Sequence, residues 1–197
     1  MKQVVLASNN AGKLREITAI LGPLGIEAIP QARFHVPEAP EPHPTFVENA
    51  LAKARNAARH TGLAALADDS GICVKALGGA PGVQSAHFAG LPKSDQRNNE
   101  KLVAELAGQA ERSAYYFAVL VLVNSENDPR PLIAEGRWAG MVIDTPRGSN
   151  GFGYDPYFYL PLHGKTVAEL DVDLKNQVSH RALALRRLAA LLGEQRE

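Results

Sequence analysis

The first third of the chain alternates short apolar runs with segments of helical periodicity. The run Val4–Ala7 precedes apolar residues at helical spacing that stop at Gly22-Pro23, and Ile26–Ile29 is a second apolar run. The T-x-x-E pattern at 45–48 matches a capping box and predicts the start of another helix. Strands that alternate with helices are typical of α/β proteins.

The second half of the chain contains the longest strand-like segments. Tyr115–Val123 is rich in β-branched and aromatic residues, and Arg130–Ile143 is predicted to extend and pair with it. The other predicted elements are strands at Leu63–Ala67, Ile72–Val74 and Tyr157–Leu160, helices from Ser94 to Leu106 and through Leu185–Leu192, and a second capping box at 166–169. We therefore predict a single domain, residues 1–197, of the α/β class with a mixed β-sheet.

The charge balance excludes several classes of partner. The 197 residues include 21 Lys and Arg and 21 Asp and Glu, so the formal net charge is zero at neutral pH. Proteins that coat nucleic acid or an anionic membrane carry a surplus of cations, so we expect neither partner.

The longest apolar run, Phe117–Val123, is far shorter than the ~20 residues that cross a bilayer, and the single Cys73 cannot form an internal disulfide. We expect a cytoplasmic protein, in which a local cluster of cations is enough to bind a small anion.

The turn Ser8-Asn9-Asn10-Ala11-Gly12-Lys13 joins a predicted strand to a predicted helix. Backbone N–H groups at a helix N-terminus, together with the helix dipole, favour an anion. Gly12 allows close approach of a ligand, and Lys13 can reach its charge. The pattern is not a Walker A loop, because Leu14 replaces the Ser or Thr that would bind magnesium. A phosphate site and a capped turn with a solvated lysine both fit this spacing.

Two adjacent acids, Asp68 and Asp69, follow the apolar run Leu63–Ala67. Acidic side chains where a buried strand ends are costly unless cations meet them. Neighbours in an extended chain point to opposite faces, so only one of the two is expected to face a given site. A magnesium ion held by carboxylates and substrate phosphates would account for an acid here, and Glu41 could supply a second carboxylate. The alternative is a turn or a helix cap, because Asp-Ser-Gly is typical of turns.

A glycine-rich stretch at 148–156 contains the pattern G-x-x-G-x-G. It precedes an aromatic strand rather than a helix, which excludes a Rossmann dinucleotide site. Phe152 lies between Gly151 and Gly153 and could stack on a planar base, because its neighbours carry no side chains. The alternative, which spacing alone favours, is a core phenylalanine beside a tight turn.

Lys175 and the sequence Ser179-His180-Arg181 precede or begin the last predicted helix. Arg and Lys donate to ligand oxygens, and His180 donates or accepts. A solvated helix start with Ser179 as N-cap is the alternative, but cations at a helix N-terminus oppose the dipole, which favours a functional role. Lys53, on an earlier predicted helix, either faces solvent or reaches a phosphate.

Six motifs occur in the order found in a known family. They are SNNAGKxxE at 8–16, TFVENAxxKA at 45–54, ADDSGxxV at 67–74, LGGAPGxxSA at 77–86, GFGYDPxF at 151–158 and SHRAxAL at 179–185. In these motifs the chain resembles the inosine triphosphatase family of non-canonical purine nucleoside triphosphate pyrophosphatases, especially its bacterial dITP/XTP branch. The resemblance covers nearly the whole chain. One departure is the Pro-His-Pro beside Glu41, which bears on the geometry of that loop.

The resemblance implies a central mixed β-sheet flanked by helices, two lobes that bound a deep cleft, and a homodimer. It also implies a Mg²⁺ cofactor. The implied reaction is hydrolysis of ITP, dITP or XTP between the α- and β-phosphates, which gives the monophosphate and pyrophosphate. The role would be to remove deaminated purines from the nucleotide pool.

The same resemblance implies roles for individual residues. Asp69 would bind Mg²⁺ and act as the general base, with Glu41 as a second metal ligand. An unperturbed carboxylate, with a pKa of about 3.9, is a weak base, so the metal would have to activate the water. The implied substrate-binding residues are Ser8, Asn9, Asn10, Ala11, Gly12, Lys13, Lys53, Ser70, Phe152, Gly153, Tyr154, Asp155, Lys175, His180 and Arg181. Within this set, Phe152 would stack on the purine, and the last three would read its keto edge.

Two other activities stay open at this point. One is a pyrophosphatase that acts on dTTP, UTP or modified pyrimidines, as in the septum-inhibitor (Maf-like) family. The other is a nucleotide-binding sensor without turnover, although carboxylates near a polyanion help binding only where a metal joins them. A comparison of ITP, XTP, GTP and dTTP as substrates separates these possibilities.

Overall fold

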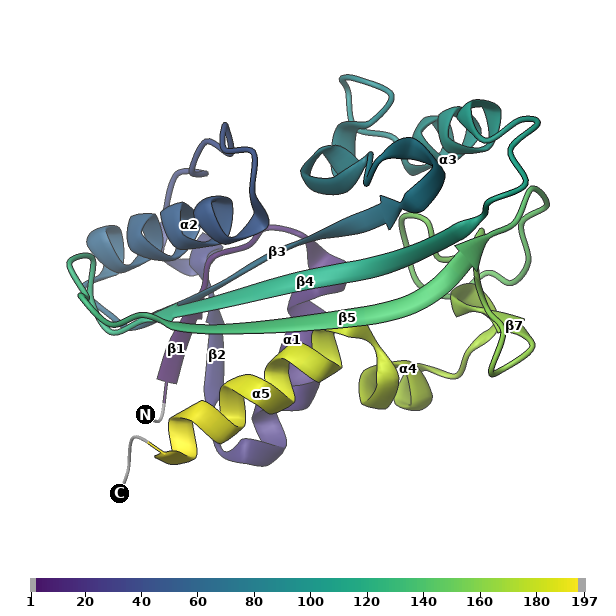
Figure 1. Cartoon of the computed structure of the whole chain (residues 1–197). Helices are drawn as coiled ribbons and strands as arrows, with labels where there is room; N and C mark the ends of the chain where they lie inside the picture. Colours follow the sequence, from purple (N-terminus) through teal and green to yellow (C-terminus); the bar gives the residue numbers. More distant parts are fainter. Residues whose placement is uncertain (1–2, 195–197) are drawn as a thin grey trace. The chain divides into compact units, whose positions relative to one another are not determined.

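The computed structural model describes residues 3–194 and contains a seven-stranded sheet in the order β2-β1-β3-β4-β5-β6-β7 (Figure 1). The strands are β1 (Gln3–Leu6), β2 (Glu27–Pro30), β3 (Ala65–Val74), β4 (Ser113–Val123), β5 (Leu132–Val142), β6 (Phe158–Leu160) and β7 (Lys165–Thr166). β1 pairs in parallel with β2 and β3, whereas β6 pairs antiparallel with β5 and β7. The predicted α/β fold with a mixed sheet is therefore confirmed.

Side-chain caps define where the first three helices begin. The helices are α1 (Ala11–Leu21), α2 (Phe46–Thr61), α3 (Asp95–Glu105), α4 (Val172–Val178) and α5 (His180–Glu194). Asn10 caps α1, and Ser94 caps α3 by accepting from the backbone N–H of the third helical residue. Thr45 caps α2: its Oγ1 accepts from Glu48 N at 3.4 Å and donates to the Glu48 carboxylate at 2.5 Å. The predicted helix starts at 45 and 94 are confirmed.

The structure departs from the sequence prediction in β3. We expected separate strands at Leu63–Ala67 and Ile72–Val74, with a turn or helix cap at Asp68–Gly71 as one alternative, but β3 runs without a break from Ala65 to Val74. The expected break and the turn alternative are wrong, because Lys13, Arg181 and Lys53 pair with the two acids and let the backbone stay extended. Gly71 is required in this strand for a different reason, because a Cβ there would overlap the carbonyl oxygen of Gly82 and the hydroxyl of Ser85.

Two smaller differences occur near the C-terminus. The capping box at 166–169 opens a single 3₁₀ turn, Val167–Glu169, rather than an α-helix. Lys175 lies in the short helix α4, which ends at Val178, with one residue between it and the start of α5 at His180. Lys175 and Arg181 therefore belong to two helices.

The chain forms two compact units, and each is assembled from discontinuous segments. The first unit comprises the described residues of Met1–Asp69, Ala118–Gly136 and His180–Glu197, and the second comprises Ser70–Phe117 and Arg137–Ser179. β3, β4 and β5 each contribute residues to both units. The single domain and the cleft expected from the sequence stay predictions.

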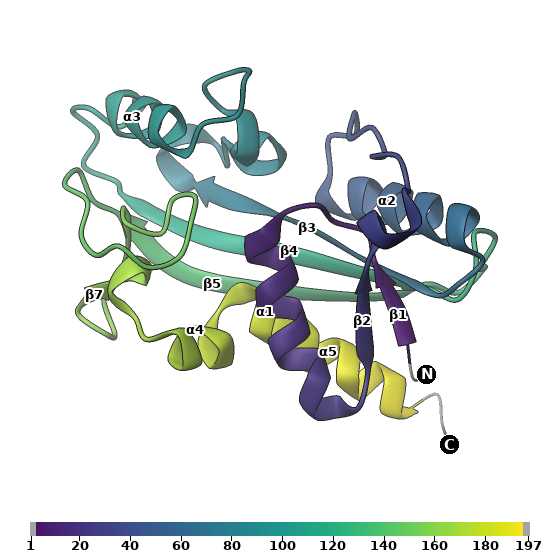
Figure 2. The same ribbon diagram turned by 180° about the vertical axis from the view of Figure 1, so that it is seen from behind.

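In the first unit, apolar side chains of β1, β3 and β4 pack against α1 and α5, which lie side by side (Figure 2). Leu6 and Leu66 belong to this apolar cluster. Their chain neighbours Val5 and Ala67 point to the other face of the sheet, because side chains alternate along a strand. α2 packs against β1 on that other face. The alternation thus determines which helices each residue of β3 faces.

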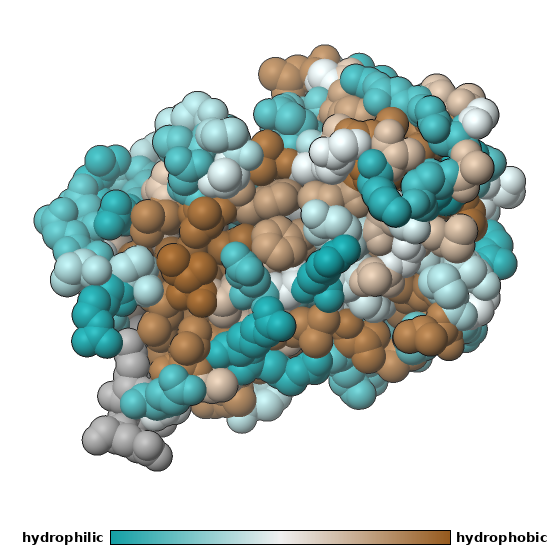
Figure 3. Space-filling model, viewed as in Figure 1, coloured by the Kyte–Doolittle hydropathy of each residue, from teal (hydrophilic) through white to brown (hydrophobic). Residues whose placement is uncertain are grey.

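The last helix, α5, shows how the first unit divides buried from exposed surface. Leu185 and Leu188 are buried in the apolar cluster, whereas Arg186 and Arg187 are exposed. Hydrophilic side chains accordingly follow the outer face of α5 in the space-filling view (Figure 3). Among the described residues, no helix is long and apolar enough to cross a membrane.

The second unit has an apolar cluster of its own, built around aromatic rings. The ring of Phe158 lies 4.5 Å from that of Tyr116 and 6.2 Å from that of Trp138, measured between centroids. Leu102 anchors α3 in the same cluster and is fully buried. Tyr154, from the glycine-rich stretch, is also buried there, so this stretch is attached to a packed core.

Candidate active site

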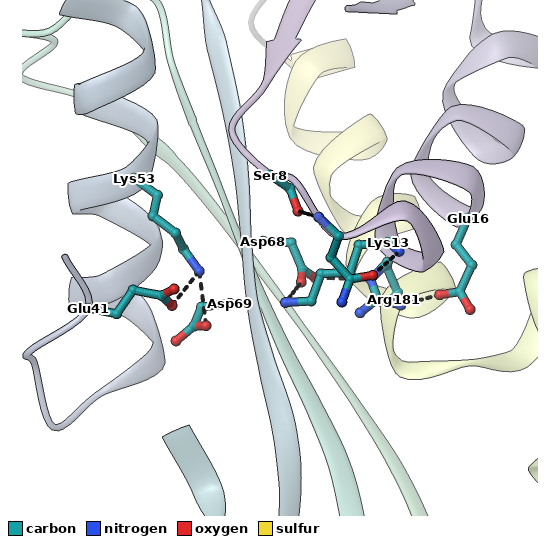
Figure 4. Close-up of polar contacts among 9 residues, drawn as sticks. Ser8, Lys13, Glu16, Glu41, Lys53, Asp68, Asp69 and Arg181 are labelled. Carbon is teal, nitrogen blue, oxygen red and sulfur yellow. Dashed lines mark hydrogen bonds and ion pairs between the residues drawn. The ribbon is translucent and has the colours of Figure 1, made fainter. Parts of the chain in front are cut away.

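Asp68 and Asp69 are neighbours in β3, and their side chains point to opposite faces of the sheet (Figure 4). Asp68 lies on the side of α1 and α5, whereas Asp69 lies on the side of α2. Both residues are buried, with 2% and 5% of their surface exposed. Burying a carboxylate is costly unless cations or donors compensate it, and each acid has a different set of partners.

Asp68 is the centre of a buried ion-pair network. Its carboxylate lies 2.5 Å from Lys13 Nζ and accepts from Arg181 Nε at 3.1 Å, while Arg181 also donates to Glu16. Burial acts to raise the pKa of Asp68, but the charges of Arg181 and Lys13 outweigh it and hold this pKa well below its usual range. Asp68 is therefore ionised at neutral pH and holds two cations in place.

Asp69 belongs to a second network, in which Lys53 lies between two carboxylates. Lys53 Nζ donates to Glu41 Oε2 at 2.8 Å and to Asp69 Oδ1 at 3.1 Å. Burial, reinforced by the charge of Glu41, raises the pKa of Asp69 despite the opposing charges of Lys53 and Lys13. A carboxylate with a raised pKa is a stronger base than a solvated one.

The charge on the cations of this region follows from the same contacts. Burial acts to lower the pKa of Lys53, but Asp69 and Glu41 together raise it above its ordinary value. Burial dominates at Lys13, where the charges of Lys53 and Arg181 add to it and the pKa is lowered. The two networks are therefore electrostatically linked, since Lys13 also acts on Asp69.

The proline-rich loop that carries Glu41 is fastened to α2 by two asparagine side chains. Asn49 accepts from the backbone N–H of His43 at 3.0 Å and donates to its carbonyl at 3.1 Å. Asn56 donates to the carbonyl of Pro37 at 2.8 Å. The Pro-His-Pro departure thus lies in a loop whose backbone is held on both sides of Glu41.

The turn after β1 is internally hydrogen-bonded and leads into α1. Ser8 Oγ accepts from Asn10 N at 3.1 Å, and Asn10 Oδ1 accepts from the backbone N–H of Lys13 at 3.1 Å. Asn9 donates to the Glu38 carboxylate at 2.9 Å. Residues 11–13 form the first turn of α1, so the predicted turn does end at a helix N-terminus. Phosphate binding there stays a prediction.

The glycine-rich stretch of the second unit is organised by Asp155. Its Oδ2 accepts from Lys175 Nζ at 2.7 Å and from the backbone N–H of Phe152 at 3.0 Å, and its Oδ1 accepts from the Tyr116 hydroxyl at 3.1 Å. Gly151 has a φ of 80°, and a Cβ there would overlap the Asp155 carboxylate, so only glycine fits.

Phe152 is not a core residue. Its side chain is half-buried, and Lys175 Nζ lies 4.9 Å from the ring centroid. Tyr154, two residues later, is buried and donates its hydroxyl to Ser85 O at 2.7 Å. The stretch therefore presents one partly exposed aromatic ring beside one cation, supported by a buried ring.

The predicted site residues divide between the two units. Ser8–Lys13, Glu41, Lys53, Asp69, His180 and Arg181 lie in the first unit, and Ser70, Phe152–Asp155 and Lys175 lie in the second. The partners of Arg181 explain its position at a helix N-terminus. Asp68 and Glu16 compensate the unfavourable interaction of its charge with the helix dipole.

Several residues with clear structural roles were not singled out by the sequence reasoning. Glu16 is the last residue of the SNNAGKxxE motif, and the motif position was the available signal. Asn49 lies one residue after the Glu of a capping box, and Asn99 lies in the interior of α3. Asparagine is unfavourable inside helices because its side chain competes for backbone groups, so buried helical asparagines were a usable signal.

The donor set around Asp69 fits a magnesium ion that also contacts a substrate. Asp69 Oδ2 is buried and has no hydrogen-bond partner among the described residues, and the Glu41 carboxylate shares Lys53 with Asp69. Mg²⁺ is typically bound by one or two carboxylates, with water and substrate phosphates as the other ligands. In the described part of the chain, no cluster of three or more His, Cys, Asp or Glu side chains is arranged to hold a metal.

The fold and these two clusters define an α/β protein with buried networks of carboxylates and cations at β3. The chain belongs to the Ham1 family, whose model matches residues 4–191.

Named relatives and solved structures cover nearly the whole chain. The chain is 64% identical over 190 residues to the dITP/XTP pyrophosphatase of Aromatoleum aromaticum, which is 96% of both chains. It is 62% identical over 188 residues to the protein of that name from Neisseria meningitidis serogroup B, which is 95% of this chain and 94% of that one. The structure of a HAM1 protein from Coxiella burnetii superposes with a TM-score of 0.91 at 49% identity, covering 98% of this chain and 100% of that chain.

Proposed function

We propose that this protein is a dITP/XTP pyrophosphatase that hydrolyses dITP, XTP and ITP to the monophosphate and pyrophosphate. The observation that carries the proposal is the Asp69 carboxylate, which is buried beside Lys53 and Glu41 and leaves Oδ2 without a hydrogen-bond partner among the described residues. The extensive identity to proteins named dITP/XTP pyrophosphatase supports it.

Asp69 would act as the general base that takes the proton of the attacking water. Its raised pKa makes it a better proton acceptor than a solvated aspartate. Asp69 and Glu41 would hold a magnesium ion. When bound, the ion would supply positive charge to the phosphates and lower the pKa of a bound water.

The residues around Asp69 and the N-terminus of α1 would bind the triphosphate. Lys53 is charged and adjacent to Asp69, so it can neutralise negative charge that develops on the pyrophosphate leaving group. Ser8–Lys13 would bind phosphate oxygens at the N-terminus of α1. Asp68 would contribute indirectly, because it holds the ammonium group of Lys13 beside this helix end.

The glycine-rich stretch would bind the purine. Phe152 would stack on the base, and Lys175 would donate to the keto oxygen that ITP and XTP carry at C6 and adenine lacks. Gly153, Tyr154 and Asp155 would maintain the shape of this site. We also keep Ser70, His180 and Arg181 as predicted substrate-binding residues, the last two for the edge of the base.

Product analysis with ITP and Mg²⁺ tests this function. We expect pyrophosphate and IMP, whereas orthophosphate and IDP would contradict the proposed cleavage site. The variant Asp69→Asn should lose turnover and still bind ITP in calorimetry. Glu27→Gln is the matched control, because it removes an exposed carboxylate that accepts a hydrogen bond from Gln3. It should leave the rate of ITP hydrolysis unchanged. Turnover of Asp69→Asn near the normal rate would contradict the role of Asp69.

A substrate panel and a mass measurement test the remaining parts. ITP and XTP should be hydrolysed well, GTP poorly, and dTTP least, so a preference for dTTP would favour the pyrimidine-directed alternative. We propose a homodimer of cytoplasmic location, and light scattering should give twice the 21.1 kDa of one chain.

A further inference from the structure

Two side chains of α3 hold the peptide groups of Gly153 from both directions. Asp95 Oδ2 accepts from Gly153 N at 2.7 Å, and Asn99 Nδ2 donates to Gly153 O at 2.9 Å. Asp95 and Asn99 are four residues apart, which places them on the same face of the helix. We call this pair the α3 clamp.

The clamped residue lies at a sensitive position in the chain. Gly153 has a φ of 64°, in the left-handed region, and a Cβ would meet nothing within 4 Å. Glycine is therefore required here by the positive φ and not by a lack of space. Its neighbour Phe152 carries the half-buried ring beside Lys175, and a rotation of the Gly153 peptide would move that ring.

The clamp is itself anchored to the core of the second unit. Asn99 is 5% exposed and also donates to Asp95 O at 2.9 Å, and Ser94 caps the helix just before Asp95. The adjacent Asn98 donates to Ser85 O and Ala86 O at 3.3 and 3.1 Å. Helix α3 thus offers a fixed support for the Gly153 peptide, in addition to the hydrogen bond from Phe152 N to Asp155.

We propose that Asp95 and Asn99 are positioning residues that set base specificity by fixing the Gly153 peptide, and with it the Phe152 ring relative to Lys175. The inference rests on the proposed function, because it assumes that Phe152 and Lys175 contact the base. It adds two residues outside the predicted site. Their contribution would be to affinity for the base rather than to the chemical step.

Steady-state kinetics of clamp variants with ITP and ATP tests the inference. In Asp95→Ala and Asn99→Ala, KM for ITP should rise about tenfold or more, as expected for loss of a hydrogen bond to a charged or buried group, while kcat changes less. The preference for ITP over ATP should fall. Asp95→Asn keeps an oxygen for the Gly153 N–H and should restore most of the affinity, whereas Asn99→Asp removes the donor and should not.

The control is Glu100→Ala, which removes an exposed carboxylate of α3 that accepts from Gln96 Nε2 at 2.9 Å. This variant should leave KM and the ITP preference unchanged. Equal losses for ITP and ATP in the clamp variants, or an unchanged KM for ITP, would overturn the inference.

Amide hydrogen exchange gives a readout that does not depend on turnover. In Asp95→Ala the Gly153 N–H loses its acceptor and should exchange about tenfold faster, or more, than in the unsubstituted protein. In Glu100→Ala its exchange rate should equal that of the unsubstituted protein. Unchanged exchange would overturn the clamp. Lack of ITP hydrolysis by the unsubstituted protein would instead overturn the proposed function, and the exchange result would still report on the clamp.

Discussion

Replacement of Asp68 by asparagine should destabilise the protein strongly, whereas the same replacement of its neighbour Asp69 should not. Asp68 is buried between Lys13 and Arg181, and both cations depend on its charge. In Asp68→Asn the charges of Lys13 and Arg181 would remain largely buried after the loss of this carboxylate, although Glu16 would still accept from Arg181. At Asp69, in contrast, burial and the charge of Glu41 raise the pKa, so the folded state disfavours the charged carboxylate, and an amide carries no charge.

The magnitude follows from the burial of the network. Removal of one partner from a buried ion pair typically costs about 3–5 kcal/mol. For a chain of this length, such a loss corresponds to a decrease in melting temperature of roughly 6–20 °C. For Asp69→Asn the linkage has the opposite sign. A carboxyl group with a raised folded-state pKa loses stabilisation as the pH rises through that pKa, so removing its charge is favourable at neutral pH, although Lys53 then loses a partner that raises its own pKa. The melting temperature should therefore fall much less than in Asp68→Asn.

Thermal and urea unfolding of both variants between pH 3 and 8 provides the assay. The pKa of Asp68 is depressed, so its stabilisation is complete above the unfolded pKa of about 4 and is lost as the pH falls toward the folded-state value. The difference in stability between the unsubstituted protein and Asp68→Asn should therefore be largest near neutrality and decrease below about pH 4.

Equal stability losses for the two variants at pH 7 would refute this reasoning. That result would mean that the two acids contribute equally to stability, and that it does not matter that Asp68 pairs with Lys13 and Arg181 whereas Asp69 pairs with Lys53. A pH-independent loss in Asp68→Asn would refute the assignment of the effect to its charge and leave only a change in packing.

Three further predictions concern other parts of the site. Gly136→Ala should lose about 1–3 kcal/mol of unfolding free energy in urea, because its Cβ would overlap the carbonyl oxygen of His180 at the start of α5. Asn49→Ala should lower the free energy of unfolding by about 1–3 kcal/mol, because the backbone N–H and carbonyl of His43 both lose their hydrogen bonds to the Asn49 side chain. It should also lower the Mg²⁺ affinity measured by calorimetry, because these bonds hold the loop that carries Glu41. Unchanged Mg²⁺ affinity would argue against Glu41 as a ligand. A chelator should abolish ITP hydrolysis and added Mg²⁺ should restore it, whereas full activity in the chelator would contradict the metal proposal.

The elements of the fold were largely predictable because they depend on local patterns. Strand and helix periodicities and the caps at Thr45 and Ser94 act over a few residues, and each appears where it was expected. β3 was not predictable in the same way. Asp-Asp-Ser-Gly is typical of a turn, but Lys13, Arg181 and Lys53 supply the charges that keep it extended, and these cations come from distant parts of the chain.

The site could be predicted as a set of residue types but not as a set of partners. The carboxylates and lysines stood out in the sequence, and the motif order indicated their family. Their pairing did not, because the spacing does not show that Lys13 and Arg181 both contact Asp68. Asp95 and Asn99 gave a weaker signal, since a hydrogen bond to the backbone of residue 153 leaves no pattern that a local reading can detect.

The contact between Glu16 and Arg181 joins residues 165 positions apart, and Arg181 belongs to the last helix of the chain. During synthesis the N-terminal part emerges first, so Lys13 and Asp68 are made long before the guanidinium group that completes their network. A nascent chain would hold Asp68 with only one of its two cations until α5 leaves the ribosome. Completion of the buried network is thus tied to completion of the polypeptide, and a chain released without α5 would lack a counter-charge at its centre.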